Sequence, residues 1–470
     1  MNRLTTFTSS LFILMSSCAV GPDYERPSTA NVPVNFDDVP EGWKPASPSD
    51  HLERGAWWKR FGDSKLNQLM DDAESSNQTA AAALARLEQA RTYSRAARSA
   101  LVPALDFGPS VENRRTSTNT FFNPDAANFQ GVQNESYRLP LDLQWEIDLW
   151  GRVRRTQNAV DAESEQAEAA YRGVILSLRA ELAQNWFSLR ATDSEIVVVR
   201  DTVKLRRNSV ELLQRRAEEG ASSDLDVARA EAESATAEAE LASLQRRREE
   251  LIGAIALLTG RMAPGYKISA HPLDGDPPRV PVSLPSELLE RRPDIAEAER
   301  RLAATSERIG VSKAALFPSI SIDGSFGLAS RTSASLLETA SRYWTYGVGA
   351  SVPLLRRNIL QQDVKRAEAV YDEALAEYRG SVLNAFREVD TALASLRWLK
   401  VQEAAVKRAS DSSSRAAKLA TDRYREGITS LLEPLDAERT RLSAKRTEIQ
   451  VRNQRYLDTI QLIKALGGGY

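Results

Sequence analysis

An unbroken alternation of apolar and polar positions runs over residues 137–149. The apolar positions are Tyr137, Leu139, Leu141, Leu143, Trp145, Ile147 and Leu149. Because successive side chains of a strand point to opposite faces, this pattern predicts a β-strand with one wholly apolar face. Strands of soluble sandwiches usually span about 5–6 residues, so this longer one is more typical of a strand with lipid outside and water inside.

Three further segments alternate in the same manner and predict the partners of that strand. We expect two strand pairs, about 104–114 with 137–149 and about 319–329 with 343–353. In the last segment, Trp344 and Tyr346 alternate with glycine, serine and threonine. One aromatic or branched face and one small polar face again indicate lipid outside and a lumen inside.

Long helices are expected between the strands, where the sequence is rich in Ala, Leu, Glu, Gln and Arg. One is predicted from Ser64 to about Leu101, shortly before Pro103. Another covers residues 155–219, where apolar residues recur every seven positions, at Ile175, Leu182, Leu189, Ile196, Val203, Val210 and Ala217. Sustained heptads predict a coiled-coil-like helix of roughly 100 Å that has partners along its full length.

The second half of the chain repeats the first. Tyr171-Arg172-Gly173 recurs as Tyr378-Arg379-Gly380, and Gly220 recurs as Gly427, both 207 residues later. The duplication predicts a first repeat over 64–260 and a second over 285–466, each with a long helical hairpin whose tip lies near residue 220 or 427. Residues 261–284, rich in Pro and Gly, are expected to be a linker, and 467–470 a C-terminal tail.

Four strands per chain make an oligomer necessary. Exposed strand edges are not tolerated in hydrocarbon, and the smallest membrane barrels use about eight strands. Two copies of the chain supply eight strands, which side chains fill, whereas three supply twelve and leave a lumen. The strands alone therefore require more than one copy and leave the number open.

The first residues have the character of a leader. Arg3, an apolar run over 11–15 and Ser16-Ser17 precede Cys18, so residues 1–17 are predicted to be a secretory signal. Small residues directly before a cysteine resemble the bacterial lipobox, in which Cys18 becomes the lipidated first residue of the mature protein. The following Pro-rich residues, 18–63, are expected to form an extended tether that carries the lipid anchor.

Composition excludes several classes of function. The net charge is −2, which gives no electrostatic reason to bind nucleic acid. One Cys and two His exclude a disulfide framework, a thiol redox pair and most zinc sites. We find no catalytic constellation, and we expect no cofactor and no enzymatic activity.

Several motifs together resemble the outer-membrane efflux protein family, the TolC/OprM-like channels, and most closely its lipoprotein branch. The matching stretches are Cys18-Ala19-Val20-Gly21-Pro22-Asp23-Tyr24, Trp57-Trp58, Phe61-Gly62-Asp63, Arg291-Arg292-Pro293-Asp294-Ile295, Ala315-Leu316-Phe317-Pro318 and Leu435-Asp436-Ala437-Glu438-Arg439. The resemblance implies a homotrimer: a twelve-stranded transmembrane β-barrel in the outer membrane joined to a long periplasmic twelve-helix α-barrel with an equatorial domain. It also implies two partners, a periplasmic adaptor and an inner-membrane transporter of the RND type.

The second hairpin tip carries a candidate periplasmic gate, comprising Tyr424, Arg425, Glu433, Asp436 and Arg439. Residues 433, 436 and 439 differ by three and so lie close to one helix face. In the family the matching Tyr, Asp and Arg positions form the constriction that closes the tunnel, and a ring of carboxylates there repels anions. Asp224 and Asp226 at the first tip are weaker candidates, and ordinary helix caps and surface pairs are the alternative interpretation for the whole set.

Two other functions are weighed against an efflux duct for small molecules. A lipid-anchored periplasmic adaptor also has long hairpins, but the four alternating strands and the duplication argue against it. An envelope enzyme such as a glycan hydrolase needs a carboxylate pair in which an apolar pocket tunes one member as acid, and the sequence places none. The transported substrate cannot be read from these residues.

Overall fold

The structure is a computed structural model that describes residues 19–25, 55–117, 133–280, 291–430 and 432–468. Two compact units form, the first from Met1–Ser28, Leu87–Ala167 and Ala298–Tyr378, the second from Thr29–Arg86, Glu168–Glu297 and Arg379–Tyr470. Each unit takes segments from both halves of the chain, so the duplicated segments are interleaved. The expected signal peptide and Cys18 lie outside the described residues, as do parts of the tether and the linker.

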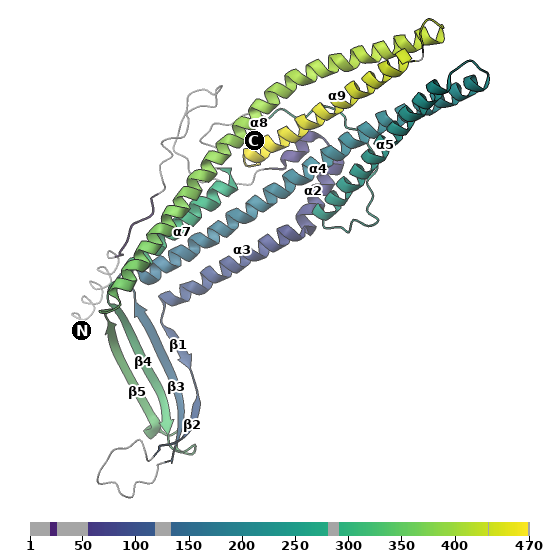
Figure 1. Ribbon diagram of the computed structural model, residues 1–470. Coiled ribbons are helices and arrows are strands. Elements are labelled where there is room, and N and C mark those ends of the chain that lie inside the picture. Colours follow the sequence, from purple (N-terminus) through teal and green to yellow (C-terminus); the bar gives the residue numbers. More distant parts are fainter. Residues whose placement is uncertain (1–18, 26–54, 118–132, 281–290, 431, 469–470) are drawn as a thin grey trace. The chain divides into compact units, whose positions relative to one another are not determined.

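The first unit contains one antiparallel sheet (Figure 1). Its strands are β1 (Ala104–Phe107), β2 (Ser110–Arg115), β3 (Gln133–Ile147), β4 (Ser319–Ser330) and β5 (Arg342–Ser351). The order is β1-β3-β4-β5, and β2 also pairs with β3. A short 3₁₀ helix, Thr339–Ser341, precedes β5. The two expected strand pairs are confirmed, and the central β3–β4 pairing joins one repeat to the other.

The first predicted strand is interrupted. Residues 104–114 form two short strands, because Gly108 and Pro109 separate β1 from β2. Proline has no N–H to donate to a ladder, and glycine weakens strand interiors. Both pieces nevertheless keep the expected faces, since Phe107 lies opposite Leu141 and Val111 opposite Tyr137.

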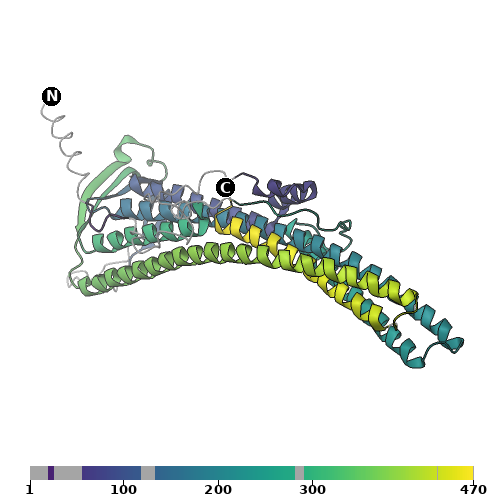
Figure 2. The same cartoon turned by 90° about the horizontal axis from the view of Figure 1, so that it is seen from above.

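Two long helical hairpins are formed, α4 (Arg152–Glu218) with α5 (Asp224–Leu258), and α8 (Arg357–Arg425) with α9 (Leu432–Ala465). Figures 1 and 2 show the two helices of each hairpin side by side near their tips. The shorter helix α7 spans Pro293–Ala314. None of the described helices combines the length and the apolar character needed to cross a membrane.

The helix predicted from Ser64 to Leu101 is broken near its start. It divides into α2 (Ser64–Ser76), α3 (Gln78–Ala97) and a 3₁₀ turn, Arg98–Leu101. Asn77 causes the break: its side-chain oxygen accepts from the backbone N–H of Ala80 at 2.9 Å and caps α3. The side-chain nitrogen donates to the carbonyl of Leu258 at 2.9 Å, which holds the break against the end of α5.

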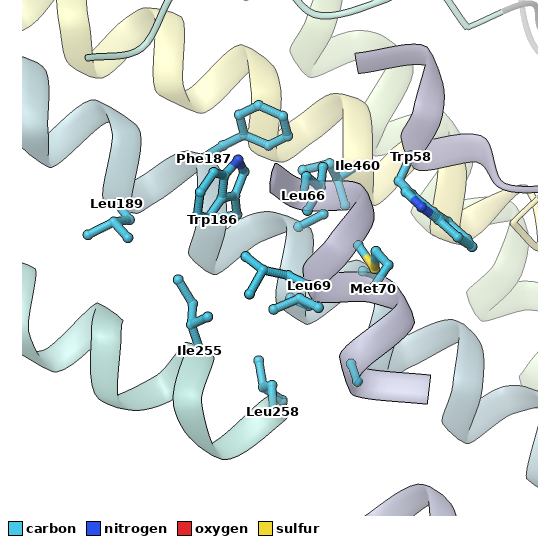
Figure 3. Close-up of a cluster of buried hydrophobic side chains, with 14 of the residues drawn as sticks. Trp58, Leu66, Leu69, Met70, Trp186, Phe187, Leu189, Ile255, Leu258 and Ile460 are labelled. Atoms are coloured by element: carbon cyan, nitrogen blue, oxygen red, sulfur yellow. The ribbon is translucent and has the colours of Figure 1, made fainter. Parts of the chain in front are cut away.

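The main apolar core lies in the second unit (Figure 3). Heptad residues Leu182 and Leu189 of α4 are fully buried and pack with Leu66 and Leu69 of α2. The short 3₁₀ helix Trp57–Phe61 adds two buried tryptophans to the same cluster. The heptad stripe of α4 therefore packs against partners here. Burying each large apolar side chain contributes roughly 1.5–3 kcal/mol to the free energy of folding.

A buried arginine joins the beginning of α7 to the ends of other helices in the second unit. Arg292 is 6% exposed and donates to the last carbonyl of α9, that of Ala465, at 2.9 Å. It also pairs with Glu388 of α8 at 2.8 Å and with Asp294 at 2.6 Å. The Arg-Arg-Pro-Asp-Ile motif therefore has a structural role, since its second arginine caps a helix C-terminus.

Candidate functional site

The two faces of the sheet differ in chemistry as the alternation requires. Large apolar side chains on one face are strongly exposed, including Phe326 (59%), Trp344 (70%) and Tyr346 (78%). Trp344 and Tyr346 also stack, with ring centroids 5.6 Å apart. A contiguous exposed apolar face of this kind marks contact with a membrane or another protein.

Carboxylates gather on the opposite face. The register places Asp106 of β1 directly across from Asp142 of β3, and Asp323 of β4 directly across from Gln144. Like charges directly opposite on an antiparallel pair repel each other, and a cation nearby relieves that repulsion. This face therefore favours cations over anions, as rings of acidic side chains do in channels.

The outer edges of the sheet are open. Among the described residues, β5 pairs only with β4, and β1 and β2 pair only with β3. Each edge presents backbone N–H and C=O groups that lack a strand partner within the chain. Such edges demand another strand, because unpaired backbone groups are costly to bury in lipid.

Both hairpin tips have the same geometry. Gly220 and Gly427 adopt left-handed conformations, with φ of 71° and 74°. The next residue in each case donates its N–H back into the helix, Ala221 to Arg216 at 2.7 Å and Ile428 to Arg423 at 2.9 Å. Glycine ends a helix in this way at little steric cost. The internal duplication thus extends to the hydrogen bonds of the tips.

One candidate gate residue joins the two tips. The phenolic oxygen of Tyr424, at the end of α8, accepts a hydrogen bond of 2.7 Å from the guanidinium of Arg216, at the end of α4. The same guanidinium lies 5.7 Å from the centroid of the Tyr424 ring. Tyr424 therefore connects the first hairpin to the second through a hydrogen bond and a cation–π contact.

The other candidates are paired within the second hairpin. Arg439 binds Asp436 at 2.5 Å within α9, and Arg425 lies 3.8 Å from Asp422 within α8. Glu433 lies 3.9 Å from Arg423 and so spans the tip from α9 to α8. All these pairs are largely exposed, and within one chain none of them reaches the first hairpin.

The weaker candidates at the first tip serve the start of α5. The hydroxyl of Ser223 accepts from the backbone N–H of Asp226 at 3.2 Å and donates to the Asp226 carboxylate at 2.7 Å. Asp224 lies in the first turn of the same helix, where a negative charge is favourable. Ser223 is the N-cap of α5, and Asp226 is the first-turn residue that this cap binds.

Sequence reasoning missed Arg216. Arginine is abundant in α4, and no local pattern distinguishes an arginine that reaches another hairpin. The duplication carried a usable signal, since Arg216 precedes Gly220 by four residues as Arg423 precedes Gly427. The duplication therefore places Arg216 near the first tip, but it does not identify Tyr424 as its partner.

The first described residues are bound to the first unit by a buried arginine. Arg155 of α4 is 4% exposed and donates to the carbonyls of Gly21 at 3.2 Å and Pro22 at 3.0 Å. It also pairs with Asp23 at 3.2 Å and with Glu307 of α7 at 3.1 Å.

The residues on either side of the segment that Arg155 binds, Val20 and Tyr24, are also attached to the first unit. Val20 donates its backbone N–H to the carbonyl of Trp150 at 3.0 Å, and the hydroxyl of Tyr24 donates to Glu299 at 2.8 Å. A Cβ on Gly310 would lie 2.1 Å from Cδ of Arg155, so the close approach requires glycine there. Residues 20–24 are therefore an integral part of the first unit.

Catalytic and metal chemistry finds no support in the part of the chain that the structure describes. No group of three or more His, Cys, Asp or Glu side chains is arranged there to hold a metal ion. The functional geometry instead consists of a two-faced sheet with open edges and a pair of linked hairpin tips.

Comparisons with known proteins agree with this geometry. The model of the family described as "Outer membrane efflux protein" matches residues 69–261 and 284–468. The chain is 32% identical to the outer membrane protein OprJ of Pseudomonas aeruginosa, covering 97% of this chain and 94% of OprJ. It is 28% identical to the toluene efflux pump outer membrane protein TtgF of Pseudomonas putida, covering 98% and 96%. The solved structure of the outer-membrane channel OprN superimposes with a TM-score of 0.86 at 33% identity, covering 96% and 99%.

Proposed function

The chain belongs to the outer membrane efflux protein family, and we propose from its open-edged sheet and linked hairpin tips how it performs the family's function. It is the outer-membrane channel of a tripartite efflux pump, a passive duct without enzymatic activity. The fold is TolC-like, with long helices and four antiparallel strand segments from two repeats.

The functional channel is a homotrimer in this proposal. The observation that carries it is the sheet, which has two open edges and a strongly exposed aromatic face. Pairing the β5 edge of one copy with the β1 and β2 edge of the next satisfies the backbone groups of both. Three copies close a twelve-stranded barrel that leaves a lumen, whereas two copies leave an interior filled with side chains.

Crosslinking of fractionated membranes tests this proposal. We expect the chain in the outer-membrane fraction, with crosslinked species that stop at three copies. Tyr346→Lys places a charge on the exposed apolar face and should reduce recovery from the outer membrane. Thr345→Lys, on the polar face, is the matched control and should not reduce it. A monomer in the periplasmic fraction would contradict the channel.

The partners proposed are a periplasmic adaptor and an inner-membrane transporter of the RND type, since a passive duct has no energy source of its own. The cargo proposed is small organic molecules, because similar proteins are named for toluene and antibiotic efflux. The polar face of the sheet carries small side chains and carboxylates, so it favours cations over anions but sets no requirement on the shape of the cargo. Susceptibility of a deletion strain to solvents and antibiotics tests the assignment.

The gate proposed lies at the periplasmic mouth. Its residues are Tyr424, Arg425, Glu433, Asp436 and Arg439, and we add Arg216 because its guanidinium donates to the Tyr424 hydroxyl. In a trimer, Glu433 and Asp436 form a ring of six carboxylates that repels anions. Separation of the α8–α9 tips from the α4–α5 tips would widen the mouth like an iris.

Cys18 is proposed to be lipid-anchored in the outer membrane. The supporting observation is the attachment of the residues that follow it. Ala19 lies against Gly151, since a Cβ on that glycine would be 3.1 Å from the Cβ of Ala19. Gly151 follows strand β3 by only a few residues. An acyl chain on the residue before Ala19 would therefore start near the end of the lipid-facing sheet.

Replacing Arg155 by Gln is expected to release the N-terminal segment. The substitution leaves Glu307 without its arginine and removes the donors to the Gly21 and Pro22 carbonyls, a loss of about 3 kcal/mol for a buried pair. Chymotrypsin should then cleave after Tyr24 at least tenfold faster. In the Cys18→Ser variant, which keeps Arg155, chymotrypsin should cleave after Tyr24 at the wild-type rate. Equal cleavage of the Arg155 variant and wild type would contradict this role.

A further inference from the structure

A cavity of about 670 Å³ lies in the second unit, and neither the sheet nor the hairpin tips contribute residues to its lining. Its walls come from the start of α2, the middle of α4, residues 267–274 and Tyr456 of α9. The irregular segment is bound to α4 by backbone hydrogen bonds, including one of 3.1 Å from the Leu273 N–H to the Arg190 carbonyl. Neither the channel nor the gate uses this cavity.

Arg190 in the cavity wall has an unsatisfied edge. The side chain is 4% exposed, and its Nη1 donates to the carbonyls of Ser269 at 3.2 Å and His271 at 3.3 Å. Nε and Nη2 are buried and have no hydrogen-bond partner. Leaving donors of a charged group buried and unpaired is costly, so this edge calls for an acceptor.

The two unpaired atoms form one recognition surface. The Nε–H and Nη2–H groups of a guanidinium lie on the same edge and point in parallel, which is the geometry that binds both oxygens of a carboxylate. Trp186 holds the plane of this guanidinium, whose Cζ lies 4.1 Å from the ring centroid. The indole in turn donates to Asp63 at 2.6 Å. The edge is therefore held in a fixed orientation.

Three acidic groups lie near the cavity, and each already accepts hydrogen bonds from the protein. Asp274, exposed in the wall, accepts from the backbone N–H of Gly275 at 2.8 Å. One Asp63 oxygen accepts from the backbone of Lys65 and Leu66 and caps α2, while the other accepts from Trp186. Asp193 accepts from Arg248 at 2.7 Å and from the His271 backbone at 2.9 Å, and it lies 3.5 Å from Arg190. Burial lowers the pKa of Arg190, although Asp193 opposes that effect.

The exposed part of the wall adds positive charge from two lysines. Lys65 and Lys267 both line the cavity, and both are exposed. Lys65 donates only to Gln68, at 3.2 Å, and among the described residues Lys267 has no ion-pair partner. Both ammonium groups lie in the same wall as Arg190 and attract an anion to the cavity.

We propose that this cavity binds a small organic carboxylate, with the Nε–Nη2 edge of Arg190 as its recognition element. Phe61, Phe187 and Tyr456 pack against one another in the wall, with ring centroids 4.5–6.0 Å apart, and they offer an apolar surface to the body of the ligand. Burial raises the pKa of Tyr456 to about 12, so its hydroxyl stays protonated at neutral pH. Both donor atoms are buried in this conformation, so binding requires the side chains that cover them to move aside.

Ligand-observed fluorine NMR on the purified full-length protein tests the site. The probe is 4-fluorobenzoate, and neutral 4-fluorobenzamide controls for partition into detergent. Saturable line broadening is expected for the benzoate only. Arg190→Lys keeps the charge but removes the parallel fork, so it should weaken binding at least about tenfold.

The second repeat supplies a matched control. Arg397 follows Arg190 by 207 residues and is exposed, so Arg397→Lys should bind the benzoate as wild type does. If the Arg190 variant fails to fold, the double variant Lys65→Gln with Lys267→Gln, at two exposed residues, is measured in its place. It should bind the benzoate severalfold more weakly than wild type does. The proposal is overturned if wild type shows no saturable binding at millimolar benzoate, or if Arg190→Lys, or the lysine double variant in its place, binds it as tightly.

Discussion

Replacing Arg216 by Ala is expected to raise the single-channel conductance of the protein in planar bilayers. The substitution removes both the 2.7 Å hydrogen bond to Tyr424 and the cation over its ring, the contact that joins the two hairpin tips of one chain. An exposed interaction of this kind contributes about 0.5–1 kcal/mol. Because a trimer loses three of them at once, the ratio of open to closed time of each channel should rise about tenfold to a hundredfold, which raises its time-averaged conductance.

The neighbouring arginine provides the control for this gate. Arg215 is also exposed near the end of α4, but it lies 3.9 Å from Glu211 of the same helix. Arg215→Ala changes the net charge equally without cutting a contact between hairpins, so its conductance should match wild type. Tyr424→Phe, which removes the hydroxyl and keeps the ring, should fall between. An unchanged conductance in Arg216→Ala would remove this contact from the gate.

Asp436 and Arg439 give a second arm of the same experiment. They pair with each other inside α9 at 2.5 Å, so within one chain they cannot hold two hairpins together. Any role in closure depends on contacts between copies. If these residues make such contacts between copies, the double variant Asp436→Ala with Arg439→Ala should raise the conductance. Its effect should add to that of Arg216→Ala, because the contacts removed are separate.

The sheet could be predicted in detail because alternation encodes its two faces directly. A shift of one residue would reverse every side chain, so the apolar set Leu139, Leu141 and Leu143 fixes the orientation of β3. What escaped prediction was the interruption at Gly108-Pro109 and the start of β3 at Gln133. The polar residues at that end carry no alternation, and pairing with β2 alone extends the strand there.

The hairpin tips could be predicted because glycine and capping residues act locally. The partner of Tyr424 could not, because Arg216 lies 208 positions earlier in the chain. The same limit applies to Arg155, Arg190 and Asn77. Each forms its decisive contacts with residues distant in sequence, and composition treats an arginine in a long polar helix as one more solvated charge.

The hairpins are also joined away from their tips, by a buried charge network. Arg446 of α9 donates through Nε to Glu195 of α4 at 3.1 Å and through Nη1 to Glu240 of α5. Gln450, one turn further along α9, donates to the same Glu195 oxygen at 3.3 Å. Glu195 is only 4% exposed, so these two donors take the place of water around its carboxylate. One side chain thus holds both helices of the first hairpin against the second.

Replacing Arg446 by Gln should therefore destabilise the protein far more than loss of any tip contact. Breaking a buried pair leaves Glu195 charged and short of a donor, at about 3 kcal/mol. Glu195→Gln with Arg446→Gln removes both charges and should regain most of that loss in chemical unfolding of the purified protein. Arg207→Gln, which cuts the exposed contact with Glu238 between α4 and α5, is the matched control and should change little. If Arg446→Gln unfolds as wild type does, the hairpins are held by their apolar contacts alone, and the tips then open without resistance from this network.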